Sequence, residues 1–134
     1  MGEAPCLFCE RFKEHKRIIL ETAEFFIIED EHPVNRGHLL IISRRHREDI
    51  FSLLPYEWVD MQVALNEAKA FADGAFEVKG YSPEGYNIGV NCGAVAGQTI
   101  FHLHIHLVPR YIGDVPDPRG GIRNFKEPLV RYNP

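Results

Sequence analysis

The segment QTIFHLHIHLVP, which runs from Gln98 to Pro109, alternates apolar and polar residues with a period of two. This period is typical of a β-strand, because successive side chains of a strand point to opposite faces. We therefore predict a strand over Thr99–Val108. One face would carry three histidines: His102, His104 and His106. The other face would pack in the core and carry Phe101, Leu103, Ile105 and Leu107.

Three histidines on one face of a strand allow three interpretations. They could be solvated or hydrogen-bonded side chains with no further role. They could bind a metal ion, but the outer two would lie ~13 Å apart on a straight strand. Zinc binds imidazole nitrogen at ~2.1 Å, so one ion shared by all three would require severe bending. They could instead supply a nucleophile, because neutral imidazole with a pKa near ~6.5 attacks phosphorus without a separate base. We favour this last interpretation, since the neighbouring histidines could bind phosphoryl oxygens.

Composition limits the classes of protein that the chain can represent. Of its 134 residues 45% are hydrophobic and 25% charged, as in globular rather than disordered proteins. No apolar run approaches the ~20 residues of a membrane span, and no secretory signal is visible, so we expect a cytoplasmic protein with no membrane partner. A net charge of −4 argues against binding nucleic acid through an overall field. Local basic residues could still bind a small phosphorylated ligand: Arg44–Arg47, Arg110, Arg119 and Arg123.

The remaining pattern predicts four more strands and one long helix. Strand-like runs rich in β-branched and aromatic residues are Arg17–Glu21, Glu24–Glu29, Gly37–Ser43 and Gly85–Cys92. The helix begins near Pro55 and fades before Gly80, or earlier at Gly74. Its apolar stripe would be Trp58, Met61, Leu65, Ala68, Ala72 and Ala75. Because no repeat or linker divides the chain, we predict one α+β domain over 1–134, with a mostly antiparallel five-stranded sheet and an irregular tail over 112–134.

The run HLHIHLV, His102–Val108, resembles the His-φ-His-φ-His-φ-φ signature of the histidine triad (HIT) family, where φ is apolar. Other segments match the family in the same order along the chain: Cys6–Cys9, Arg36–Ile42, Ala96–Thr99 and Val108–Tyr111. The resemblance implies a HIT-like fold with a short N-terminal helix and a nucleotide substrate. It also implies a homodimer with the long helix and a central strand at the interface.

The resemblance also implies roles for single residues. His104 matches the nucleophile that forms a covalent nucleotidyl-histidine, and His106 the histidine that contacts the phosphoryl group; His102 completes the catalytic triad. Three further residues match polar residues that lie near the phosphate or the leaving group in the family: Gln98, Thr99 and Asn91.

The nucleoside would be held by a carboxylate and an apolar pocket. Asp30 matches the residue that binds the ribose hydroxyls, and a carboxylate can accept from two vicinal hydroxyls. Phe8 and Ile28 match the walls of the nucleobase pocket, and His38 occupies a supporting position. Each has a simpler alternative: Asp30 could cap a turn, Phe8 and Ile28 could be core, and Asn91 could end a strand.

The pair Cys6-x-x-Cys9 could be redox-active, incidental or metal-binding. Some bacterial HIT members bind structural zinc with this pair, the histidine after the central strand and the first triad histidine. Those positions are Cys6, Cys9, His46 and His102, a set that completes a closed tetrahedral site. By this resemblance Zn2+ would fasten segment 1–16 to the catalytic strand, and no catalytic metal is required.

The implied activity is a nucleotide hydrolase or transferase that acts at the α-phosphorus. The tail Gly113–Arg123 resembles that of dinucleoside polyphosphate hydrolases, so an Ap4A-like substrate that releases AMP is the leading prediction. Arg119 and Arg123 could meet distal phosphates or be solvated. The alternatives are hydrolysis of nucleoside phosphoramidates or aminoacyl-AMP, phosphorolysis of dinucleoside polyphosphates, and a zinc-containing nucleotide-binding module without catalysis.

Overall fold

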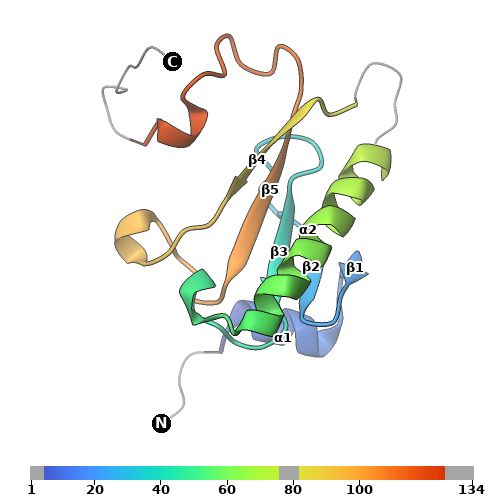
Figure 1. The fold of residues 1–134 in the computed structure, drawn as a ribbon, viewed down its shortest axis with the longest axis vertical. Helices are drawn as coiled ribbons and strands as arrows, with labels where there is room; N and C mark the ends of the chain where they lie inside the picture. The colour runs from blue at the N-terminus through green and yellow to red at the C-terminus, as the bar shows by residue number, and fades with distance from the viewer. Residues whose placement is uncertain (1–4, 76–81, 126–134) are drawn as a thin grey trace.

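Five strands form one sheet in the order β1-β2-β3-β5-β4, and every neighbouring pair is antiparallel (Figure 1). The structure, a computed structural model, describes residues 5–75 and 82–125. The strands are β1 (Leu20–Glu21), β2 (Phe25–Glu29), β3 (Leu39–Ser43), β4 (Gly85–Gly89) and β5 (His104–Arg110). The helices within these described residues are α1 (Leu7–Glu14), α2 (Pro55–Ala75) and three short 3-10 turns, η1 (Ile50–Ser52), η2 (Ala94–Ala96) and η3 (Gly121–Arg123). The prediction of an α+β fold with one long and one short N-terminal helix is confirmed.

The histidine strand is shifted relative to its predicted bounds. β5 begins at His104 rather than Thr99, because the backbone N–H of Leu103 donates to the carbonyl of Arg47, outside the sheet. Phe101 lies before the strand with 43% of its surface exposed, so its predicted place in the core is wrong. At the other end β5 continues through Pro109. There it pairs with β4 alone, so the missing proline N–H breaks no bond to β3.

Helix α2 covers one face of the sheet (Figure 1). Residues on this face of β2, β3 and β5 form one cluster with four α2 side chains, Met61, Ala64, Ala68 and Ala72. These four and the buried Glu57 recur every three or four residues, so they share one side of the helix. Trp58 lies outside this row and is exposed, so its predicted place in the stripe is wrong. Gly74 lies within the helix, whereas Gly80 and the side chain of Ala75 lie outside the described residues.

The face of the sheet opposite α2, here called the triad face, carries the side chains of His104 and His106. A second apolar cluster there contains Phe8 of α1 and four strand residues, Phe26, Ile28, Leu40 and Ile42. His104 and His106 stand beside Ile42 and Leu40 in the register of β3 and β5. Because side chains alternate between faces, the two histidines lie on the α1 side of the sheet. The predicted separation of an apolar face from a histidine face therefore holds for His104 and His106.

A buried ion pair fixes the beginning of α2. Glu57 has no exposed surface, and its carboxylate accepts from Arg47 at 3.0 and 3.2 Å and from the Leu54 backbone N–H at 2.9 Å. The carbonyl of the same Arg47 accepts from Leu103. The helix is thus tied to the segment that leads into β5.

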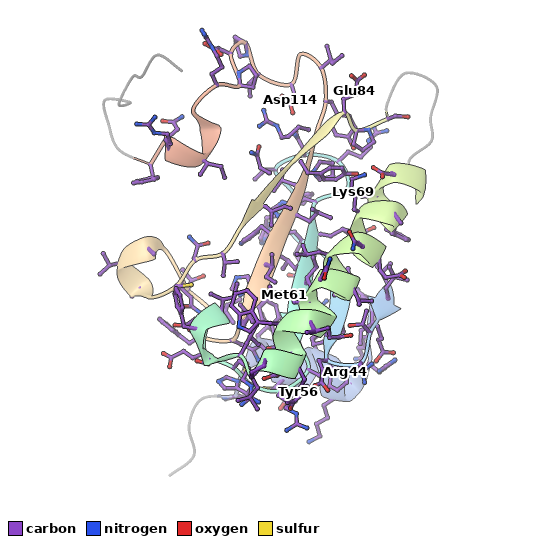
Figure 2. The ribbon with its side chains drawn as sticks, in the orientation of Figure 1. Arg44, Tyr56, Met61, Lys69, Glu84 and Asp114 are labelled. Carbon is purple, nitrogen blue, oxygen red and sulfur yellow. The ribbon has the colours of Figure 1, made fainter. Side chains whose placement is uncertain are left out.

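The described part of the tail is anchored beyond the end of β5, where Figure 2 labels Asp114. The Asp114 carboxylate accepts from Arg110 and from the side chain of Asn35, both at 2.8 Å. Asn35 also donates to the carbonyl of Pro109, which joins the loop between β2 and β3 to the end of β5. Across the described residues, no helix is long and apolar enough to cross a membrane.

Candidate active site

A pocket of about 460 Å3 opens on the triad face of the sheet, and its volume suits a small-molecule ligand. Its apolar wall comes from α1, β2, β3 and the segment before β5, and consists of Leu7, Phe8, Ile28, Leu40 and Ile100. Its polar side comprises Arg11, Asp30, Glu31, His32, Asn91, Thr99, His104 and His106. The pocket therefore brings together the predicted base, ribose and phosphate contacts, apart from His38 and Gln98.

His104 has a fixed tautomer. Its Nδ1 lies 2.8 Å from the carbonyl oxygen of His102, and a carbonyl can only accept. Nδ1 therefore carries the proton of the neutral ring, and Nε2 keeps a lone pair. Phe8 packs edge-on against the imidazole at 5.1 Å between ring centroids, which limits its rotation. A held imidazole with a free Nε2 is what a nucleophile at this pocket requires.

His102 has the opposite tautomer and a different environment. Its Nε2 donates to the carbonyl of Ser43 at 2.7 Å, so Nδ1 keeps the lone pair and points toward Cys6 and Cys9. The ring is fully buried, and this burial lowers the pKa of His102 to about 4. His102 is therefore neutral at pH 7. It does not line the pocket and supports His104 through its own carbonyl.

His106 belongs to a third arrangement, with Asp30 and His38. His106 Nδ1 lies 3.0 Å from His38 Nε2 and 3.8 Å from Asp30 Oδ2. Burial, with the nearby His104 and His38, lowers the pKa of His106, and burial also lowers the pKa of His38. His38 is 4% exposed and lies behind His106, outside the pocket lining. In its predicted supporting position, His38 therefore contacts His106 but does not line the pocket.

Asp30, His38 and His106 place three potential ligand atoms close together, but the hydrogen bonding opposes a metal there. A histidine that binds a metal through Nε2 keeps its proton on Nδ1 and donates it to an acceptor. Nδ1 of His38 instead accepts from the backbone N–H of Val34 at 3.2 Å. This cluster is therefore a hydrogen-bonded group rather than a metal site.

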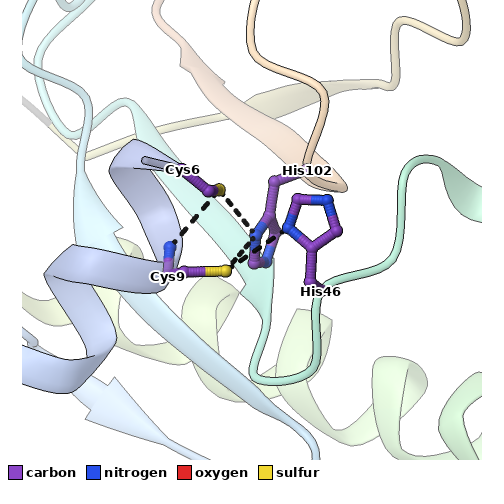
Figure 3. Close-up of side chains that lie close together, drawn as sticks. All are labelled: Cys6, Cys9, His46 and His102. Atoms are coloured by element: carbon purple, nitrogen blue, oxygen red, sulfur yellow. Dashed lines mark hydrogen bonds between the residues drawn. The ribbon is translucent and has the colours of Figure 1, made fainter. Parts of the chain in front are cut away.

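The second cluster fits a metal ion. Cys6 and Cys9 come from the start of α1, His46 follows β3, and His102 precedes β5 (Figure 3). Their ligand atoms all lie within 4.8 Å of one another. Three of the four sulfur–nitrogen distances are 3.2, 3.3 and 3.5 Å. Zinc in a tetrahedral site holds sulfur and nitrogen about 3.6 Å apart, so the Cys2His2 set needs little adjustment.

The Cys9 thiol must lose its proton to bind a metal. Burial and then the neighbouring Cys6 raise the pKa of the Cys9 thiol to about 11. Metal binding would therefore release the Cys9 proton, and the positive charge of a divalent metal would stabilise the thiolate that forms. The carbonyl of Ser43 orients the His102 ring as an outer partner does in metal sites.

The polar residues around the triad divide between ligand contact and support. Thr99 and Asn91 line the pocket, and their contact with the phosphate or leaving group stays a prediction. Gln98 is 4% exposed and outside the lining; its amide accepts from the Gly93 N–H and donates to the carbonyls of Glu48 and Ile100. Its amide is fully engaged in holding the loop before β5, so the predicted contact with a leaving group does not fit.

The basic residues that suggested a phosphate patch lie elsewhere. Arg47 is bound to Glu57, Arg110 to Asp114, and Arg119 to Asp117. Among the described arginines the pocket is lined by Arg11 alone, which is held by Glu31 at 2.6 Å. The ion pair between Arg11 and Glu31 could not be predicted from the sequence, because the two residues lie twenty positions apart and belong to no common motif.

A family model, the HIT domain, matches residues 11–113. The chain belongs to the HIT family. An uncharacterized HIT-like protein of Methanocaldococcus jannaschii is 32% identical over 111 residues, 81% of each chain. An AP-4-A phosphorylase of Mycobacterium tuberculosis is 38% identical over 86 residues, which cover 62% of this chain and 40% of that protein. A Zn-bound histidine triad family protein from Mycobacterium smegmatis has a crystal structure with a TM-score of 0.65, 34% identity and 84% coverage of both chains.

Family membership confirms the resemblance predicted from the triad and its flanking segments. The HIT chain is a nucleotide-binding enzyme of the hydrolase and transferase type. Its Cys2His2 cluster can bind a metal.

Proposed function

We propose that this HIT protein hydrolyses dinucleoside polyphosphates at the α-phosphorus through a covalent nucleotidyl-His104 intermediate. The observation that carries the proposal is the tautomer of His104: its Nδ1–H donates to the His102 carbonyl, which leaves the Nε2 lone pair for attack. Pure binding requires no such nucleophile, which disfavours a non-catalytic nucleotide-binding module.

In this proposal an apolar wall and a carboxylate of the pocket bind the nucleoside. Phe8 and Ile28 supply an apolar surface for the base, and Asp30 supplies a carboxylate for the ribose hydroxyls. With base and ribose held there, the phosphorus nearest His104 is the one attached to the ribose. In the first step the Nε2–P bond forms and the bridging P–O bond breaks, so the distal nucleotide leaves. In the second step water attacks phosphorus, the N–P bond breaks and a nucleoside monophosphate is released.

Other pocket residues assist both steps of the reaction by contacting the phosphoryl group or the leaving group. Neither step requires a metal. In this proposal His106 donates a hydrogen bond to a phosphoryl oxygen, and Thr99 and Asn91 contact the phosphoryl group or the leaving group. Zinc would be held by Cys6, Cys9, His46 and His102, none of which lines the pocket. Bound zinc would supply structural cross-linking between α1 and the segment before β5.

The products of diadenosine tetraphosphate test the proposal. Attack at the α-phosphorus gives AMP and ATP, whereas attack at the centre gives two ADP. In water enriched with heavy oxygen the label enters AMP alone, because water reacts only with the histidine-bound phosphoryl group. Mass spectrometry of the products measures both. Two ADP, or label in ATP, would contradict this placement of the nucleoside.

A phosphorylase is the second candidate, favoured by the similarity to the AP-4-A phosphorylase of Mycobacterium tuberculosis. In that reaction phosphate replaces water in the second step, so the products in phosphate buffer are ADP and ATP. Repeating the assay with and without phosphate separates the two reactions. Nucleoside phosphoramidates and aminoacyl-AMP, which carry a different leaving group on the same α-phosphorus, complete the substrate panel.

We further propose that the protein forms a homodimer through α2. Tyr56, Val59 and Val63 lie on the side of α2 away from the core and are 45%, 68% and 46% exposed. The edge strand β4 carries a further exposed apolar side chain, Ile88, at 49%. A central strand is hydrogen-bonded on both sides, so β4 is the better candidate than the predicted central strand.

A charge on this face should separate the dimer. Val63→Asp places a carboxylate among apolar side chains that a dimer would bury, so we expect a monomer by sedimentation. Ile112→Asp, at an 83% exposed position in the tail, is the matched control and should leave the mass unchanged. A wild-type protein that sediments as a monomer at micromolar concentration would contradict the dimer.

A further inference from the structure

His38 immediately precedes β3 and lies beside His106, and its two ring nitrogens are both engaged. Nδ1 accepts from the backbone N–H of Val34 at 3.2 Å, and an amide N–H can only donate. Neutral His38 must therefore carry its proton on Nε2. The burial of His38 favours this neutral form.

The proton on His38 determines where His106 carries its own. His38 Nε2–H faces His106 Nδ1 at 3.0 Å, so His106 Nδ1 accepts. The remaining nitrogen of His106, Nε2, must then carry the proton of the neutral ring. We infer that His38 is a positioning residue that holds His106 as the Nε2–H tautomer, the form that donates to a phosphoryl oxygen.

The nearby Asp30 carboxylate would favour the other tautomer of His106 if His38 did not donate to it. Its Oδ2 lies 3.8 Å from His106 Nδ1 and 3.4 Å from His38 Nε2. Without the His38 proton between them, the carboxylate attracts the His106 proton to Nδ1. Nε2 would then present a lone pair to the phosphoryl oxygen, and two acceptors repel. With the His38 proton in place, the Asp30 carboxylate can bind the ribose hydroxyls while the Nε2–H of His106 still donates to the phosphoryl oxygen.

The beginning of this chain of hydrogen bonds is fixed by the fold. The Val34 amide belongs to the loop between β2 and β3, and the neighbouring Asn35 binds the Pro109 carbonyl at 3.1 Å and Asp114 at 2.8 Å. The Asn35 carbonyl also accepts from the His38 backbone N–H. Because the first donor is a backbone amide, which does not titrate near neutral pH, the direction of the chain cannot reverse without moving the loop.

Nitrogen NMR of the full chain labelled in its histidine rings measures the tautomer directly, without substrate. The spectrum of His106→Gln identifies the His106 signals by their loss. In the wild type we expect His106 Nε2 to be protonated and Nδ1 unprotonated. In His38→Leu we expect the opposite, and in His38→Gln, whose amide can donate at a similar position, the wild-type pattern. Protonated Nδ1 in the wild type overturns the inference even if a variant fails to fold.

Turnover of diadenosine tetraphosphate gives the functional measurement, and this step rests on the proposed function. His38→Leu should lower kcat at least about tenfold with KM within about threefold, because the donor acts on the phosphoryl group and not on the nucleoside. His38→Gln should recover most of that loss. If His38→Leu keeps wild-type kcat, or keeps the wild-type His106 tautomer, the role of His38 is wrong. If the tautomers behave as expected but the wild type cleaves no dinucleotide, the proposed function fails and the inference about His38 stands.

Discussion

His104→Asn is expected to abolish turnover while nucleotide affinity stays within about tenfold of wild type. The asparagine amide can still donate to the His102 carbonyl, so it keeps the hydrogen bond that Nδ1 makes and removes Nε2. Removal of a nucleophile typically costs several orders of magnitude in kcat, and we expect a loss of at least about 10⁴-fold. Affinity survives because Asp30 and the apolar wall of the pocket are unchanged.

The measurement combines steady-state kinetics with mass spectrometry of protein quenched during turnover. Wild-type protein should gain the mass of one nucleotidyl group, a nucleoside monophosphate less water, on the peptide that contains His104, and the variant should not. His15→Asn is the matched control, since His15 is an exposed histidine in the left-handed conformation that asparagine tolerates. Appreciable turnover by His104→Asn would refute the nucleophile, and loss of turnover in His15→Asn would point to a general defect.

The period-two pattern of the triad segment correctly predicts which face His104 and His106 occupy. This works because alternation is a local property of an extended chain, and His104 to Leu107 pair regularly with β3. The same pattern fails for Phe101, since that residue precedes the strand. The departure is caused by the carbonyl of Arg47, which lies far away in the sequence and captures the Leu103 N–H.

The roles of the three histidines were less predictable than their positions. Each tautomer is set by a partner that the triad segment does not contain or does not reveal: the Ser43 carbonyl for His102, the His102 carbonyl for His104, and His38 for His106. Gln98 shows the same limit of sequence reasoning. A glutamine beside a catalytic strand looks like a ligand contact, but burial and three backbone partners make it part of the scaffold.

Loss of zinc is expected to destabilise the protein about as much as truncation of a large side chain in the apolar core. The cluster joins α1 to β3 and β5, and α1 supplies Phe8 to the pocket wall. Zinc that binds only the folded chain stabilises it by about 4 kcal/mol when free zinc exceeds its Kd 1,000-fold. For a domain of this size that corresponds to roughly 10 °C or more in Tm. We expect about one zinc per chain in protein purified without chelator, measured by elemental analysis.

Cys9→Ser should lose the metal and the associated stability together, because an alcohol is a far weaker zinc ligand than a thiolate. Cys92→Ser is the matched control: Cys92 is a free cysteine outside the cluster, so zinc content and Tm should stay at wild-type values. Chelation of the wild type should reproduce the Tm of Cys9→Ser and leave Cys9→Ser itself unaffected. Metal-free wild type with an unchanged Tm would refute the structural zinc site. Because the four ligands lie outside the pocket lining, nucleotide binding measured below the lowered Tm should persist, which separates a structural metal from a catalytic one.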